Sequence, residues 1–383
     1  MVETVQNEGQ RTGRQASGRI DIKRVLKTTG AIIGFMIGAG FSTGQETLQY
    51  YTSEGWMGVV GAFVAYVCVF LLFYCFMVTG VRTGMCHSKD IFRYYCGKHI
   101  GAFYEIATVC LLFLVSVTMV SGAGAVFGQY FGISEAIGRG VMCLLILISV
   151  LGGLRKLLDV LGFLGPLIIV CLVVIAVVSL AGNPGGIVSA PEFIESCDPP
   201  ILKASGFWLL SAVLYGMSNV YPLASYGSAL GARSASKSEA VLGAALAAAS
   251  LAIGASLVVL SQLANIEMVY DQAVPTLALV QYYMPAAAAV VFAIVLFLGI
   301  YTTVTPSVWA FAQHFGEDRS RRYTISTVLA VIGVFIVSFL PYEQLLNVVY
   351  PFSGYLAYFM IGAMIIKHAH LFMAKWRDKK FKS

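Results

Sequence analysis

Residues 34–46 decide the fold, and they read GFMIGAGFSTGQE, with four glycines close together. They lie in the middle of an apolar run, residues 25–51, that is long enough to cross a lipid bilayer. Glycine weakens an α-helix because it loses more backbone entropy on folding than any other residue. Broken backbone at membrane depth is tolerated only inside protein or beside a water-filled cavity. The stretch therefore predicts an interrupted helix beside a polar site in a membrane protein.

The composition agrees with this prediction. Of the 383 residues, 58% are hydrophobic and only 11% are charged, whereas a soluble protein carries about 25% charged residues. The net charge is +6, but the basic residues lie in loops and tails rather than on one face, which excludes a nucleic-acid partner. We expect the lipid bilayer and a small-molecule substrate as partners, and no pattern indicates an obligate protein partner.

Ten apolar stretches are candidates for membrane spans. They run over residues 25–51, 56–79, 102–129, 137–151, 157–180, 206–230, 240–263, 285–311, 323–340 and 345–366. We expect one all-α integral membrane domain over residues 25–366. A polar tail at 1–24 precedes it, and a basic tail at 367–383 follows it.

The basic residues predict the orientation, because cytoplasmic loops carry an excess of Lys and Arg. With the N-terminus inside, all 25 Lys and Arg except Arg139 and Lys203 fall on the cytoplasmic side. Residues 1–24 lack the apolar core and cleavage site of a signal peptide, so we expect them to stay as a tail. Both termini are therefore expected in the cytoplasm.

Ten spans with both ends inside give the two halves of the chain, residues 25–180 and 206–366, opposite orientations. Such an inverted repeat of five plus five helices recurs in secondary transporters. Their substrates bind near the midplane, on interrupted helices at corresponding positions of the two halves. The first helix of each half is therefore the place to look for a site.

The first span of the second half contains YGMSNVYP at residues 215–222, where Pro222 removes a backbone donor. We therefore expect helices 1 and 6 to be discontinuous at the midplane. Alternatively, the Gly34-x-x-x-Gly38 spacing marks close helix packing and Pro222 a structural kink.

A third polar cluster, Gly299-Ile-Tyr-Thr302-Thr303, lies in span 8 at about the depth of Gly34. A hard monovalent cation prefers several oxygen ligands, which carbonyls at an unwound turn and two hydroxyls can supply. From the spacing alone, we interpret the two threonines instead as hydroxyls bonded to the carbonyl one turn earlier.

The phrase IGAGFSTGQE at residues 37–46 resembles the first-helix signature of the uncharacterised bacterial YkvI-type membrane proteins. These resemble the amino acid, polyamine and organocation transporters and the sodium-coupled symporters of the LeuT fold. The resemblance implies that fold, in which helices 1, 2, 6 and 7 rock against helices 3, 4, 8 and 9. It also implies a secondary transporter, not an enzyme, in the bacterial inner (cytoplasmic) membrane.

The resemblance further implies a sodium site, with sodium as coupling ion and no other cofactor. Its ligands would be the carbonyls of Gly34, Ile37 and Gly299 and the hydroxyls of Thr302 and Thr303. Phe41 stands where a second sodium site of the neurotransmitter symporters expects asparagine, so we expect that second site to be absent.

The candidate substrate-binding residues lie at the two predicted breaks and in span 3. They are Gly38, Gly40, Phe41, Ser42, Thr43, Ser121, Tyr215, Ser218, Asn219 and Tyr221. New helix N-termini at the breaks favour an anionic group, which suits an amino acid, and an amine-like solute is also considered.

Glu46 is a candidate gate or coupling residue, because an ionisable group inside a span is functional by default. In a continuous helix it lies roughly 12 Å from the centre of span 1 towards the outside, where it could attract a cationic substrate. Alternatively, at that depth it is an ordinary residue near the headgroups.

The preferred function is sodium-coupled symport of a small organic solute by alternating access. A proton-coupled or exchange carrier of the same fold, or a ligand-sensing receptor that kept the fold, is the alternative. An intramembrane enzyme would need paired catalytic groups at the midplane, whereas all five histidines lie in loops or near span ends.

Overall fold

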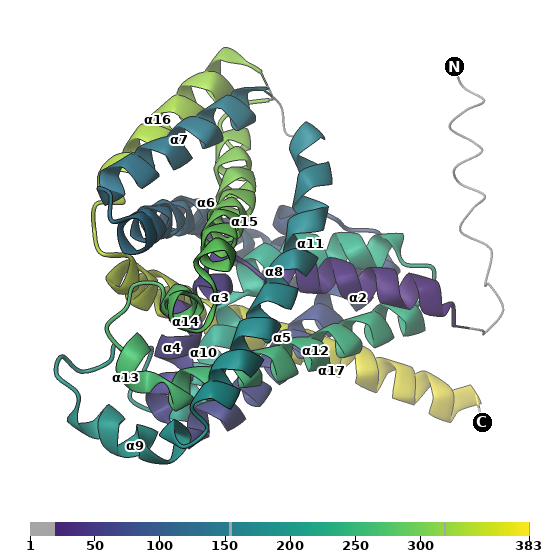
Figure 1. The fold of residues 1–383 in the computed structure, drawn as a ribbon. Helices are drawn as coiled ribbons and strands as arrows, with labels where there is room; N and C mark the ends of the chain where they lie inside the picture. The colour runs from purple at the N-terminus through teal and green to yellow at the C-terminus, as the bar shows by residue number, and fades with distance from the viewer. Residues whose placement is uncertain (1–19, 153–154, 318, 383) are drawn as a thin grey trace.

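The computed structural model describes residues 20–152, 155–317 and 319–382 (Figure 1). Most of the tail predicted at residues 1–24 therefore lies outside the described residues. Within those ranges every regular element is helical and no strand is present. The all-α prediction is confirmed for this part of the chain.

The first half of the chain contains α2 (Ile22–Met36), α3 (Ala39–Thr43), α4 (Gln45–Tyr50), the 3-10 helix η2 (Thr52–Glu54), α5 (Trp56–Thr83), α6 (Ser88–Phe131), α7 (Glu135–Gly152), α8 (Arg155–Gly182) and α9 (Gly186–Ser196). The second half contains α10 (Trp208–Ser218), α11 (Val220–Arg233), α12 (Lys237–Ala264), α13 (Ile266–Val269), α14 (Pro275–Tyr283), α15 (Ala286–Gln313), α16 (Arg321–Val337) and α17 (Tyr342–Lys382).

Six of the described helices are long and apolar enough to cross a membrane on their own. They are α5, α6, α7, α12, α15 and the part of α17 up to Ala369. The pair Leu167–Gly182 and Gly186–Ser196, bent by 95°, gives a seventh if it is counted as one span. Interrupted helices fail such a test because each piece is shorter than a span of about 20 residues. A protein with multiple membrane helices is confirmed, and the number ten stays a prediction.

The predicted interruption of the first span is present. Helix α2 ends at Met36, and Gly38 has extended backbone (φ −86°, ψ −179°) before α3 begins at Ala39. A second interruption follows at Gly44, whose φ of 81° lies in the left-handed region that favours glycine. Three short helices, α2, α3 and α4, thus replace one continuous helix.

The sixth predicted span is interrupted less sharply. Asn219 separates α10 from α11 and keeps near-helical dihedral angles (φ −77°, ψ −5°). Its side-chain amide donates to the carbonyl of Tyr215 at 2.8 Å. Pro222 falls in the first turn of α11, where backbone amides have no partner within the helix, so the missing donor costs little there.

Two segments differ from the prediction. The span predicted at 102–129 belongs to the longer helix α6, which begins at Ser88 and bends at Gly97, where φ is 78°. The basic segment after residue 366 continues α17 to Lys382. A change from apolar to charged residues marks the end of a membrane segment but does not end a helix, because both residue types are compatible with helical backbone.

The helices pack in two groups. Helix α5 packs against α10, α11 and α12, and α12 also contacts α2. Helices α6, α7, α15 and α16 pack on one another. Helices α9, α13 and α14 lie together with α4 at one end of the bundle in Figure 1, which we call the loop end. The arrangement places the interrupted helix α2–α3–α4 where the two groups meet, since α2 and α4 contact α12 while α3 contacts α15 and α6.

Candidate functional site

The break between α2 and α3 lies against α15. A methyl group placed on Gly38 would lie 3.8 Å from Oγ1 of Thr303. One turn earlier on α15, a methyl group on Gly299 would lie 2.7 Å from Cδ1 of Ile168, on α8. The break between α2 and α3 and the segment of α15 with Thr303, from two distant parts of the sequence, therefore lie against each other.

The threonine hydroxyls form the bonds expected from spacing alone. Oγ1 of Thr302 donates to the Gly299 carbonyl at 2.7 Å, and Oγ1 of Thr303 donates to the same carbonyl at 3.3 Å. A hydroxyl that donates its hydrogen still presents two lone pairs. Back-bonding and cation coordination are therefore compatible, and the two interpretations are not exclusive.

The packing interpretation of the glycine pair receives no support. A methyl group on Gly34 would meet no atom within 4 Å, and one on Gly38 would make only ordinary contacts. A small-residue packing motif requires backbones to approach so closely that a side chain would overlap them. The geometry instead leaves open space beside Gly34.

Glu46 does not lie where a continuous helix would put it. Because the chain turns at Gly44, the Glu46 side chain folds back and its carboxylate packs against Gly40, where any side chain would overlap it. The residue is 6% exposed. The hydroxyl groups of Tyr215 and Tyr350 lie near the carboxylate. The predicted separation of roughly 12 Å from the centre of the span assumes an unbroken helix, which the turn at Gly44 interrupts, and the depth of Glu46 in the membrane stays a prediction.

Six tyrosines surround this carboxylate, and we call them the tyrosine cluster. They are Tyr50, Tyr51, Tyr66, Tyr215, Tyr342 and Tyr350. The rings of Tyr50 and Tyr51 each meet the ring of Tyr215 edge to face, with centroids 5.4 Å apart. The cluster draws on α4, α5, α10 and α17, together with Tyr51 just after α4, so it joins segments that are far apart in the sequence.

The cluster is tied to α3 through a polar chain. The Tyr342 hydroxyl lies 2.9 Å from Oγ1 of Thr43, which also donates to the carbonyl of Gly40 at 2.9 Å. Of the predicted substrate-binding residues, Gly40, Thr43 and Tyr215 are thus brought together around Glu46.

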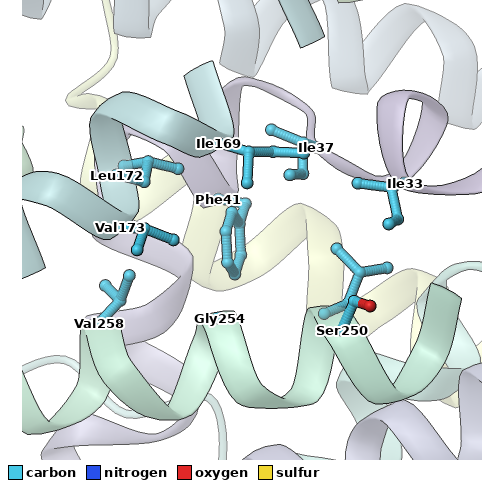
Figure 2. A pocket seen from close by; sticks show the side chains of 10 residues that line it. Ile33, Ile37, Phe41, Ile169, Leu172, Val173, Ser250, Gly254 and Val258 are labelled. Atoms are coloured by element: carbon cyan, nitrogen blue, oxygen red, sulfur yellow. The ribbon is translucent and has the colours of Figure 1, made fainter. Parts of the chain in front are cut away.

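Phe41 points elsewhere. Figure 2 shows its ring in a cavity of about 70 Å³ between α2–α3, α8 and α12. Its lining is apolar except for Ser250. Such a lining offers no group to orient a polar solute.

The remaining predicted substrate residues are bonded locally or lie apart. Ser218 donates to the Tyr215 carbonyl at 2.8 Å, and Ser121 donates to the Leu340 carbonyl at 2.8 Å. Tyr221 packs with Tyr104, at a ring distance of 6.2 Å. Gly38 faces the candidate sodium site, and Ser42 forms a hydrogen bond to its carbonyl at 3.1 Å.

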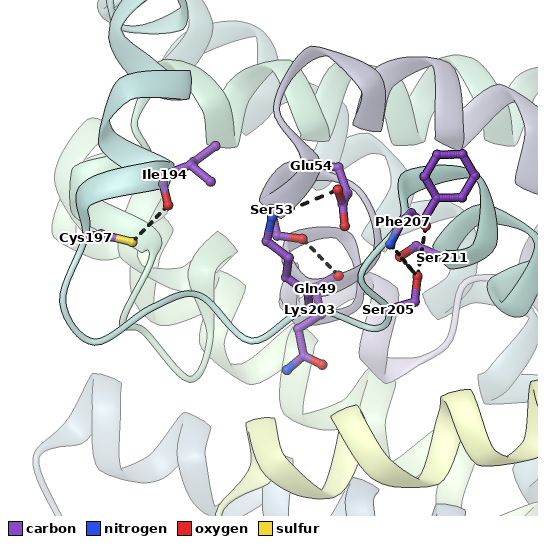
Figure 3. A network of polar contacts seen from close by, with 9 residues as sticks. All are labelled: Gln49, Ser53, Glu54, Ile194, Cys197, Lys203, Ser205, Phe207 and Ser211. Carbon is purple, nitrogen blue, oxygen red and sulfur yellow. Dashed lines mark hydrogen bonds and ion pairs between the residues drawn. The ribbon is translucent and has the colours of Figure 1, made fainter.

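The loop end of the bundle is closed by polar contacts that converge on α4 and η2. The amide of Ala204 donates to the Gln49 carbonyl at 3.0 Å, and the Asn347 side chain donates both to the Lys203 carbonyl and to Oε1 of Gln49. Figure 3 shows Lys203 facing Glu54, with a distance of 4.0 Å between the charged atoms. The connection between α9 and α10, which we call the strap, thus crosses the end of α4 and is hydrogen-bonded to it.

Two further hydrogen bonds of one side chain, which we call the clamp, hold the turn at Gly44. The buried side chain of Gln262, on α12, donates to the Gly44 carbonyl at 2.9 Å and accepts from Thr52 at 2.6 Å. Neither Gln262 nor five of the six tyrosines was a sequence candidate. Tyrosines near span ends are typical of the membrane interface, and Tyr66, in the middle of the span predicted at 56–79, is one apolar-run residue among many, so their separate positions carried no signal of a shared site.

Comparison with known proteins agrees with the sequence motif. The uncharacterised membrane protein YkvI of Bacillus subtilis (strain 168) is 26% identical over 347 residues, which cover 88% of this chain and 94% of YkvI. The uncharacterised protein YyaD of the same organism is 23% identical over 99 residues, 26% of this chain and 28% of YyaD. No protein-family model matches the chain. The predicted resemblance to YkvI is confirmed.

Solved structures show the fold. The inward-facing conformation of Mhp1 has a TM-score of 0.60 at 12% identity and matches over 89% of this chain and 75% of Mhp1. The chain shares its fold. A substrate-bound, outward-open Na+-coupled sialic acid symporter gives a TM-score of 0.58 at 13% identity, over 89% of this chain and 78% of the symporter. A variant of the manganese transporter of Eremococcus coleocola gives a TM-score of 0.56 at 16% identity, over 92% of this chain and 80% of the transporter. These symporter neighbours have the LeuT fold.

Proposed function

We propose that the protein is a secondary active transporter that moves a small organic solute by alternating access, in symport with sodium. The observation that carries this proposal is the break at Ile37 and Gly38, which lies against Thr303 on α15. Interrupted helices whose freed carbonyls face hydroxyls are the way secondary transporters of this kind hold a coupling ion. The fold shared with a Na+-coupled symporter supports the same proposal.

In this proposal the ten predicted spans form a five-plus-five inverted repeat in the inner membrane, with both termini cytoplasmic. The loop end is then the outer end, and its strap across α4 closes the outer path. A sodium ion would bind among the carbonyls of Gly34, Ile37 and Gly299 and the hydroxyls of Thr302 and Thr303. A metal-ion substrate receives less support, because the described residues hold no group of three or more His, Cys, Asp or Glu side chains fit for a metal.

Sodium is expected to raise the melting temperature of the purified protein relative to equal potassium. A ligand that binds only the native state adds about 2.7 kcal/mol to the free energy of unfolding when its free concentration is one hundred times its dissociation constant. The double variant Thr302→Val plus Thr303→Val removes both hydroxyls at nearly constant volume and is expected to abolish the sodium-specific shift. Differential scanning fluorimetry in matched ionic strength measures it.

The matched control is Thr305→Val on the same helix. The Thr305 hydroxyl is buried without a partner, so its removal is expected to leave the sodium shift intact and to stabilise the protein slightly. A sodium shift that persists in the double variant contradicts the proposed site. The absence of any sodium shift in the unmodified protein favours the proton-coupled or exchange alternative.

Measurements in proteoliposomes distinguish a transporter from a ligand-sensing receptor. A transporter accumulates its solute when a sodium gradient is imposed, and accumulation collapses when an ionophore dissipates the gradient. A receptor that kept the fold binds its ligand without accumulation. Accumulation driven by a proton gradient alone would replace sodium as the coupling ion.

A further inference from the structure

We propose that Glu46 and the tyrosine cluster bind the substrate, and that this substrate is a small organic cation carrying an amine or quaternary ammonium group. The inference rests on the proposed function, because it names the substrate class of that transporter. It concerns a different place from the candidate sodium site, since Glu46 lies on α4 and the threonine pair on α15.

The Glu46 carboxylate has no cationic partner among the described residues. The Glu46 side chain is 6% exposed, and no described Lys, Arg or His forms an ion pair with it. Its polar neighbours include the phenol groups of Tyr215 and Tyr350, which carry no charge. A buried carboxylate without a cationic partner is strongly unfavourable. A cationic solute seated beside it would supply the missing charge.

The side chains around Glu46 suit an organic cation better than an inorganic one. An inorganic cation requires several oxygen ligands, whereas an organic ammonium group is attracted to the faces of aromatic rings. The tyrosine cluster offers six such rings around one carboxylate. Tyr50 and Tyr51 are 1% and 0% exposed, and their hydroxyl oxygens have no partner. Both hydroxyls are thus free to accept hydrogen bonds from an ammonium group or to line a quaternary one.

An anionic solute does not fit beside Glu46. The sequence predicted that a substrate carboxylate would meet the amides at the start of α3. The structure instead places the Glu46 carboxylate against Gly40, the second residue of α3. A second carboxylate beside it would bring two like charges together in a dry site, which is unfavourable. The solute that fits therefore carries a net positive charge at this end.

Access to the cluster requires movement of α4. Gln45, Glu46 and Gln49 are all buried, and the α9–α10 connection bonds to Gln49. Release of these contacts frees α4, which carries Glu46 and Tyr50, from the rings supplied by α10 and α17. Opening of the loop end thus exposes the carboxylate and the ring faces together.

The test measures binding to the purified full-length protein by differential scanning fluorimetry and isothermal titration calorimetry. The probes are choline and n-butylammonium, each paired with a neutral compound of similar shape, 3,3-dimethylbutan-1-ol and butan-1-ol. We expect at least one cation to raise the melting temperature in a saturable manner, and neither neutral compound to do so. Titrations in sodium and in potassium show whether the two sites are coupled.

Substitutions test whether the cation binds at Glu46 and the tyrosine cluster. Glu46→Gln keeps the shape and removes the charge, and it is expected to weaken cation binding at least 100-fold. Glu343→Gln, which removes a carboxylate on α17 outside the cluster, is expected to leave binding unchanged. Tyr51→Phe keeps the ring and is expected to retain most of the affinity, whereas Tyr51→Leu is expected to lose about tenfold.

The outcomes are distinguishable from a failure of the proposed function. A Glu46→Gln protein that keeps its sodium-specific shift is folded, so loss of cation binding in it supports the inference. Equal shifts by a cation and its neutral counterpart, or full cation binding by Glu46→Gln, overturn the inference. A sodium shift without any response to either cation overturns the substrate class and leaves the transporter proposal standing.

Discussion

Replacement of Gly231 by alanine is expected to destabilise the protein by about 3 kcal/mol or more. A methyl group there would lie 2.6 Å from the Cα and 2.7 Å from the carbonyl carbon of Met77, in the backbone of α5. Side chains can rotate away from an added methyl group, but the backbone of a packed helix cannot. Helices α5 and α11 must therefore separate along their contact, and the melting temperature is expected to fall.

Gly80→Ala is expected to have a similar effect from the other side of the same contact, because its methyl group would lie 2.9 Å from the backbone nitrogen of Ala232. Gly254→Ala on α12 is the matched control, since a methyl group there meets no atom within 4 Å. The control is expected to be neutral or to gain up to about 1 kcal/mol from better helix propensity. Equal losses in all three variants would contradict the close-packing explanation.

Replacement of Gln262 by leucine is expected to destabilise the protein by about 2–4 kcal/mol. The variant leaves the Thr52 hydroxyl without its partner at 2.6 Å. It also removes one of the two donors to the Gly44 carbonyl, at 2.9 Å, which then accepts only from the Leu48 amide, a loss of about 1 kcal/mol. Each buried polar group left unpaired costs about 1–3 kcal/mol. The melting temperature in detergent measures the effect.

Gln281→Leu is the control for this change, because Gln281 is exposed and its single side-chain contact is at 3.5 Å. We expect a change within about 0.5 kcal/mol there. A Gln262→Leu protein as stable as its parent would show that the clamp on α4 contributes nothing to the closed conformation.

The interruption of the first helix could be predicted because its cause is local. Glycine weakens helical backbone wherever it stands, and residues 34–46 contain enough of it for a break. The position of Glu46 could not be predicted, because it depends on the second turn at Gly44. A single left-handed residue redirects everything after it, and nothing in the pattern distinguished Gly44 from the other glycines.

The tyrosine cluster lay beyond sequence reasoning for a different reason. Its members come from several helices separated by up to 300 residues, from Tyr50 to Tyr350. Their common feature is a shared neighbour, the Glu46 carboxylate, and a shared neighbour in space leaves no periodicity in a chain. Tyr215 was a candidate only because it precedes the predicted break.

The strap across α4 sets how the closed end can open. Gln49 donates to the Glu343 carbonyl at 2.8 Å while its own oxygen accepts from Asn347, which in turn holds the Lys203 carbonyl. Each of these bonds contributes only about 1 kcal/mol, but they share atoms, so the loss of one misaligns the next. We therefore expect this linked set of hydrogen bonds to break cooperatively, so that all of its bonds are lost in one step. Release then breaks a few hydrogen bonds rather than a packed core, which suits the alternating access that we propose.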